Sequence, residues 1–120
     1  MQPLHTYDLD KRKLLSAICH GSIFFSTLIL AIGIPIGIFF VSDDPVVKAN
    51  AKEAINFHFN VWFWGIVIVV LSVVTLGLLG FILAPIGYLI HWGMSIWAIV
   101  HSLTQSDSPF RYPFIIRLFD

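Results

Sequence analysis

Four histidines, His20, His58, His91 and His101, are the residues of this sequence best suited to chemistry. Each lies in or beside an apolar stretch, where polar side chains are costly and therefore candidates for function. Two histidines on facing helices could ligate a haem iron, as in b-type cytochromes. The four follow no distinctive spacing, however, and hydrogen bonding to neighbouring helices explains them more simply. A haem carrier is therefore kept only as the last of three hypotheses.

The stretch from Asn50 to Asn60 carries the most unusual group of polar side chains. Glu53, Asn56 and Asn60 share one face of a helix, at positions i, i+3 and i+7, whereas His58 points roughly the opposite way. A carboxylate and two amides entering a bilayer need partners, and the arginines near the carboxyl terminus could supply them. The group is interpreted either as a polar collar that fixes the depth of the helix or as a binding or gating element.

The carboxyl-terminal segment mixes aromatic residues with basic ones. Aromatic rings favour the membrane–water boundary and arginine can extend its charge to it. The simplest interpretation is a lid across the cytoplasmic end of a helix bundle. Its candidate functional or structural residues are Arg111, Tyr112, Pro113 and Arg117.

A polar stripe recurs at heptad-like spacing in the last apolar stretch, with Tyr88, His91 and Ser95 as its first members. His20 belongs to a similar, shorter stripe in the first apolar stretch. Small and hydroxyl-bearing residues let membrane helices approach closely and hydrogen-bond to one another. The stripes predict the internal seam of a bundle, with a polar path or substrate-binding face as the alternative.

No nucleophile–base pair, phosphate-binding loop or pair of acids can be found, so we expect no enzyme and no cofactor. The single cysteine, Cys19, excludes an intramolecular disulfide and a multi-cysteine metal site. Seven basic residues balance seven acidic ones, and this balance argues against a nucleic-acid partner.

The distribution of charge indicates an integral membrane protein. Of the 120 residues, 58% are hydrophobic and only 12% are charged. No Asp, Glu, Lys or Arg lies between Lys13 and Asp43 or between Glu53 and Asp107. A globule of this size could not hide two such stretches from water, so the partners expected first are the lipid bilayer and other membrane subunits, including further copies.

The pattern predicts an all-α bundle of four helical segments at about 14–32, 35–41, 45–77 and 81–103, between tails at 1–13 and 105–120. Asp44 followed by Pro45 is a helix-start signal. Pro35, between two glycines, predicts a break, so the second segment is expected to be short and re-entrant. A single crossing of 14–41, giving three spans in all, is the alternative.

The positions of the basic residues favour the four-segment arrangement. If the segment 14–41 enters the membrane and returns, all seven Lys and Arg lie on one side. An excess of Lys and Arg marks the cytoplasmic side. We therefore expect both termini to be cytoplasmic, in a bacterial plasma membrane or a thylakoid membrane.

Four sequence stretches together resemble the Tic-twenty family and its short bacterial, especially cyanobacterial, relatives: Cys19–Ser22, Val41–Val46, Lys52–Phe57 and Arg111–Arg117. The resemblance covers about residues 12–119. It implies a small helical membrane fold and a subunit of a protein-transport complex, with the chloroplast member proposed as a core of the inner-envelope translocon. The leading hypothesis is thus a non-enzymatic translocon-type subunit. The alternative is a membrane scaffold or assembly factor for other complexes, such as photosynthetic ones.

Overall fold

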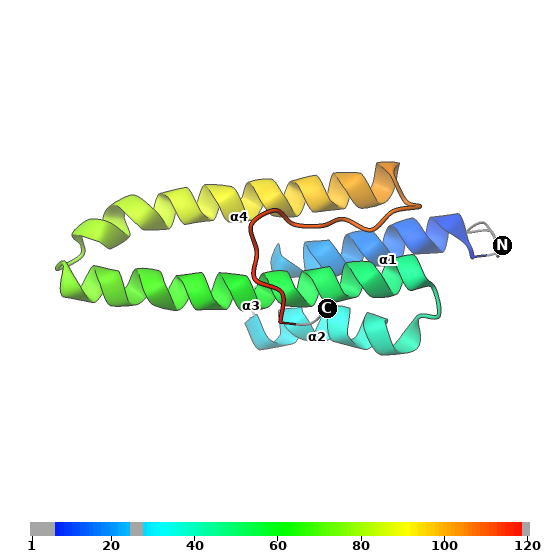
Figure 1. Cartoon of the computed structure of the whole chain (residues 1–120), viewed down its shortest axis with the longest axis horizontal. Coiled ribbons are helices and arrows are strands. Elements are labelled where there is room, and N and C mark those ends of the chain that lie inside the picture. Colours follow the sequence, from blue (N-terminus) through cyan, green and yellow to red (C-terminus); the bar gives the residue numbers. More distant parts are fainter. Residues whose placement is uncertain (1–6, 25–27, 119–120) are drawn as a thin grey trace.

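The computed structural model describes residues 7–24 and 28–118, and all its regular elements are helical. They are α1 (Leu9–Gly21), a 3₁₀ turn (Ser22–Phe24), α2 (Leu28–Val41), α3 (Pro45–Val74) and α4 (Leu78–Thr104) (Figure 1). The predicted all-α membrane fold with four helical segments is confirmed. The elongated molecule measures 57 × 24 × 23 Å.

The two long helices, α3 and α4, form an antiparallel hairpin along the full length of the molecule (Figure 1). Leu76 and Gly77 make the turn with positive φ angles of 57° and 92°. At about 1.5 Å per residue the helices are roughly 45 and 40 Å long, enough to cross a hydrocarbon core of about 30 Å. Within the described residues, these are the two helices that are both long and apolar enough to do so.

The shorter helices, α1 and α2, pack beside only one half of this hairpin (Figure 1). Asp8 caps α1 through the backbone amides of Asp10 and Lys11, and Asp44 caps α3 through that of Val46, one residue after Pro45. With 13 and 14 residues, α1 and α2 are each about 20 Å long, too short to cross the core alone. The chain therefore runs out along α1 and returns along α2.

The expected break at Gly33–Gly37 is wrong. Pro35 lies inside a continuous α2 and is buried, whereas the first helix ends at Gly21 instead of continuing to residue 32. A proline removes one backbone hydrogen bond, a loss that helices in a membrane environment tolerate when neighbouring elements pack against them. The helices α1 and α2 on either side of the 3₁₀ turn run in opposite directions (Figure 1).

The carboxyl-terminal segment, residues 105–118, is called the strap here. It turns back at the end of α4, runs beside that helix and crosses α3 near its middle (Figure 1). The predicted lid across the end of the bundle is therefore wrong, because the strap lies along the bundle. The outer parts of the two expected tails, residues 1–6 and 119–120, lie outside the described residues.

Candidate functional site

Buried polar side chains gather in the half of the molecule that contains α1, α2 and the strap. Twelve polar or charged residues are buried among the described residues, and most belong to α1 or to the first half of α3. The other half, around the α3–α4 turn, exposes large apolar side chains such as Val74, Leu76 and Phe81. The polar half is therefore where a functional site could be built, and the apolar half is suited to lipid.

Arg12 ties three segments of the chain together at the outer end of the polar half. Its Nε and Nη2 donate to the two carboxylate oxygens of Asp44 at 2.7 and 2.9 Å, and Nη1 donates to Asp107 at 3.2 Å. The Arg12 side chain is fully buried, while that of Asp107 is 70% exposed. The hydrogen bonds that Arg12 donates to Asp44 raise the pKa of Arg12 above its usual value, so the guanidinium stays charged. The start of α3 and the start of the strap are both fixed to α1 by this one side chain.

A chain of neutral hydrogen bonds continues inward from Arg12. The Asn50 amide nitrogen donates to Ser16 Oγ at 3.0 Å and to Val46 O at 3.1 Å, which identifies Asn50 Oδ1 as the acceptor atom. This oxygen accepts from Phe110 N at 3.0 Å and lies 2.7 Å from His20 Nε2. His20 must then carry its proton on Nε2, and its Nδ1 accepts from the Tyr112 hydroxyl at 2.7 Å.

Removing the Tyr112 hydroxyl tests this chain of hydrogen bonds. Tyr112→Phe keeps the ring but leaves His20 Nδ1 buried without a donor, which is expected to cost about 1–2 kcal/mol of unfolding free energy. Burial raises the pKa of Tyr112 well above its usual value, so the hydroxyl remains a donor across the accessible pH range. The measurement is unfolding in detergent, with Tyr88→Phe, a change at an exposed ring, as control. Equal stability of the two variants would contradict the bond.

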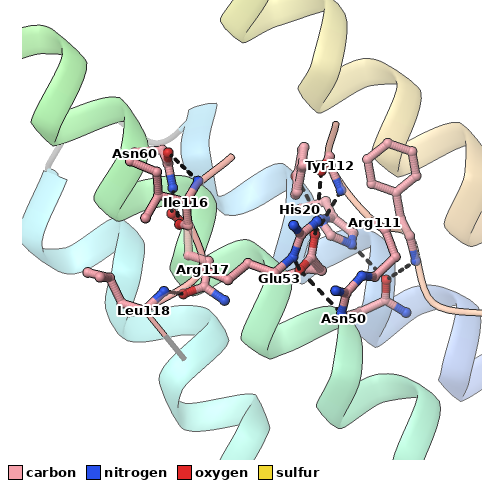
Figure 2. Close-up of polar contacts among 11 residues, drawn as sticks. His20, Asn50, Glu53, Asn60, Arg111, Tyr112, Ile116, Arg117 and Leu118 are labelled. Carbon is pink, nitrogen blue, oxygen red and sulfur yellow. Dashed lines mark hydrogen bonds and ion pairs between the residues drawn. The ribbon is translucent and has the colours of Figure 1, made fainter. Parts of the chain in front are cut away.

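Glu53 anchors the strap to α3 (Figure 2). Its Oε2 accepts from the Tyr112 backbone amide at 2.7 Å, and both its oxygens accept from the Arg117 guanidinium, at 2.6 and 3.0 Å. Arg117 also donates to the Tyr112 carbonyl at 2.7 Å, and Arg111 lies 3.8 Å from Glu53. The arginines of the carboxyl-terminal segment are therefore the partners of this carboxylate, as the sequence predicted. The Glu53 side chain is only 3% exposed.

Two asparagines of α3 hold the last part of the strap by its backbone. Asn60 accepts from the Ile116 amide at 2.9 Å and donates to the Ile116 carbonyl at 2.6 Å, as a neighbouring β-strand would. Asn56 Oδ1 accepts from the Leu118 amide at 3.0 Å. Because these bonds go to backbone atoms, Asn56 and Asn60 fix the path of the last part of the strap largely independently of its side chains.

Between these anchors the strap inserts its aromatic rings into the core. Tyr112 stacks on Phe57 at 4.2 Å between centroids with an interplanar angle of 3°, and Phe110 meets the Tyr112 ring edge-on at 4.9 Å. Phe114 instead is fully exposed and has a positive φ of 62°, which is unusual for a bulky residue. The strap is thus anchored on both sides of a strained residue that faces outward.

Comparison with known proteins gives one decisive match. The model of the magnetosome magnetite crystal formation protein family (MamF/MmsF) matches residues 11–119. The chain belongs to this family. No curated protein and no solved structure matches the chain.

Membership of the MamF/MmsF family corrects the resemblance drawn from the sequence. The expected Tic-twenty relationship is wrong, and with it the hypothesis of a protein-transport subunit, because the family match covers nearly the whole chain. The motifs that suggested it have structural roles in this fold. Glu53, Tyr112 and Arg117 hold the strap, and Asp44 caps α3 and binds Arg12.

In this MamF/MmsF protein the predicted helix seam is only partly internal. His20 and Ser95 are buried, but Tyr88 is 58% exposed and leans on Trp92, so its placement in the seam is wrong. The exposed position follows from its place in the half of α4 that α1 does not cover. His91 is half-buried and lies over Phe57, at 5.8 Å between ring centroids.

His58 lies on the opposite face of α3 from the strap, as its position in the sequence predicts. It is buried, and its Nε2 lies 3.1 Å from Ser22 Oγ. Ser22 donates its own proton to the Cys19 carbonyl, so His58 acts as the donor in the second contact. His20 uses both ring nitrogens in short hydrogen bonds, so an iron could take it as a ligand only by breaking the link to Tyr112 or Asn50.

Three members of the polar core were missed by the sequence analysis: Arg12, Asn50 and Asp107. A usable signal existed for Arg12, because it stands at i−4 and i−8 from Ser16 and His20 on one face of α1. Asn50 was noted only as the start of a polar stretch. For Asp107, the pairing depends on the return of the strap to α1, which local sequence does not encode.

Proposed function

We propose that this protein is a non-enzymatic membrane scaffold that takes part in magnetite crystal formation by organising other components of the magnetosome membrane. The observation that carries the proposal is the use made of the buried polar groups. Glu53, Arg12 and His20 are the side chains best able to take part in a reaction. Each of them is instead hydrogen-bonded in a way that holds the strap or α3 in place. Because these side chains are used for structural hydrogen bonds, the core supports a rigid binding platform better than it supports a reaction centre.

The physical cost of the core supports a role in rigidity. Buried charged and polar groups must have their hydrogen-bond partners, and removing one partner is costly. Arg12, Glu53 and Asn56 meet this requirement by binding the distant segment 105–118, which is thereby held against α1 and α3. The surface that results has a constant shape, which suits the binding of other membrane subunits.

We also propose that the polar half faces the cytoplasm. All seven Lys and Arg lie in α1, in the first half of α3 or in the strap, at the end remote from the α3–α4 turn. In a Cys19→Ser background, Ser108→Cys should react with an impermeant thiol reagent added from the cytoplasmic side, and Leu76→Cys only from the other side. Both positions are exposed, so labelling from the same side would contradict this topology.

Function is tested in a magnetite-forming bacterium that lacks its own member of this family. The wild-type chain is expected to restore crystal size and number in electron micrographs, whereas Glu53→Gln is expected to restore them weakly at equal protein abundance. Arg111→Gln, which changes a more exposed partner 3.8 Å from the same carboxylate, is the control. Mild-detergent co-purification should recover other magnetosome membrane proteins with the wild type. Full restoration by Glu53→Gln with the strap released would contradict a platform role.

A further inference from the structure

The α3–α4 hairpin encloses a groove that the polar core does not use. Its volume is about 710 Å³, and its walls are almost entirely apolar, with Trp64, Gly65 and Ile68 on α3 facing Gly87 and Ile90 on α4. Along α3 the lining runs from Phe57 to Leu71, which corresponds to about 21 Å of helix. The groove therefore lies within the two helices that are able to span the membrane.

Both ends of the groove are closed by the protein itself. Toward the turn the helices touch, since a Cβ on Gly80 would lie 1.6 Å from Ser72 Oγ. Toward the polar half, Pro113, Phe114 and Ile115 of the strap form the end wall. Between these ends the lining side chains Trp64, Ile86 and Ile90 are each at least half exposed, so the groove is continuous with the apolar surface of the hairpin.

The surroundings of the groove favour a lipid chain as its occupant over a second protein helix, because the groove lies within the two helices that are able to span the membrane. A single acyl chain is narrower than a helix. The groove runs along about 21 Å of α3, which exceeds the depth of about 15 Å of one hydrocarbon leaflet, so it is long enough for such a chain. The groove is also continuous with the lipid-facing surface, so a chain can enter from the bilayer without passing the strap.

Glycine marks both walls of the groove. Gly65 lies in the interior of α3, where glycine costs about 1 kcal/mol relative to alanine, and a Cβ there would meet nothing within 4 Å. Gly87 stands on the facing wall, where a Cβ would touch only Ile68, at 3.5 Å. Gly65 therefore leaves open space on the α3 wall of the groove, whereas Gly87 stands where α4 comes within reach of Ile68.

We propose that this groove binds one acyl chain of a membrane phospholipid, with the polar end of the lipid toward the strap. Asn60 and His91, the polar residues of the lining apart from Tyr88, stand toward that end. The methyl end then lies where Ser72 meets Gly80. Pro113, Phe114 and Ile115 of the strap then border the end of the groove at which the polar part of the lipid lies.

The test measures the phospholipid retained by the full chain after purification in detergent and washing. The wild type should retain about one lipid per chain, and Gly65→Leu, which projects a branched side chain into the middle of the groove, should retain less than a fifth of that. Gly93→Leu is the matched control, since Gly93 on α4 is, like Gly65, an exposed helical glycine with open space at its Cβ but does not line the groove. Gly87→Leu on the opposite wall repeats the test should Gly65→Leu fail to fold.

A photoreactive phospholipid with a diazirine near the methyl end of one chain locates the contact. Adducts should map to residues near Leu71 and Leu83 in reconstituted wild type and should disappear selectively in Gly65→Leu. Equal lipid retention by Gly65→Leu and Gly93→Leu would overturn the proposal. So would rapid disulfide formation between two copies carrying Gly65→Cys and Cys19→Ser, because a second copy would then fill the groove.

Discussion

Arg12→Met is expected to be the most destabilising single substitution in the polar core, at roughly 3–5 kcal/mol. The methionine can occupy much of the space of the arginine stem, but it leaves the Asp44 carboxylate buried at 8% side-chain exposure without its counter-charge. Asp44 would still cap α3 through the Val46 amide, so the helix start should persist while its attachment to α1 is lost. Chemical unfolding in detergent micelles, followed by circular dichroism, measures the difference.

Lys13→Met is the matched control for Arg12→Met, since it removes a basic residue from the same helix at a position without a hydrogen bond to Asp44 or Asp107. Its expected cost is below about 0.5 kcal/mol. Arg12→Lys keeps the charge but cannot reproduce the two-pronged contact, so it should fall between the two. Comparable losses for Arg12→Met and Lys13→Met would show that the contact with Asp44 contributes little to stability.

Glu53→Gln is expected to release the strap. The neutral amide loses the charge-assisted bonds to Arg117 and cannot accept at both positions, which should cost roughly 2–4 kcal/mol. Because the strap is the last segment of the fold, much of this loss should appear as local opening before global unfolding. Trypsin cleavage after Arg117 or Arg111 should therefore become at least ten-fold faster, under conditions in which circular dichroism shows that the helices remain folded.

Arg111→Gln controls for a simple change of charge beside Glu53, because that guanidinium is 59% exposed and stands 3.8 Å away. It should leave cleavage after Arg117 within about two-fold of wild type, since exposed ion pairs contribute little. Cleavage after Arg117 at the wild-type rate in Glu53→Gln would mean that Asn60 and Asn56 hold the strap without the carboxylate.

The sequence predicted the elements better than their arrangement. The helix start at Asp44 was recognisable because capping is local chemistry. The all-helical membrane fold followed from the charge-free stretches, which admit few other structures. The position of the first break was misjudged because the proline rule considers one helix alone, whereas Pro35 is packed against neighbouring elements.

In the candidate site, too, features encoded within one helix could be predicted, whereas contacts between distant segments could not. Glu53, Asn56 and Asn60 were identified because a carboxylate and two amides in an apolar helix need partners, and arginines were expected to provide them. That Asn56 and Asn60 bind strap backbone could not be foreseen, because any sequence offers backbone amides. The buried state of Arg12 depends on three segments meeting, which only the folded chain reveals.

The unequal lengths of the two helical hairpins have a consequence for the membrane itself. Around the α3–α4 turn the described part of the molecule consists of the ends of α3 and α4, whereas α1, α2 and the strap lie beside these helices in the polar half (Figure 1). Such a wedge occupies more area in one leaflet than in the other and relieves strain where the bilayer is bent toward the narrower side. Amphipathic membrane proteins respond to curvature in this way. The shape of the chain alone would concentrate it on small, tightly curved vesicles, with its broad end on the convex surface.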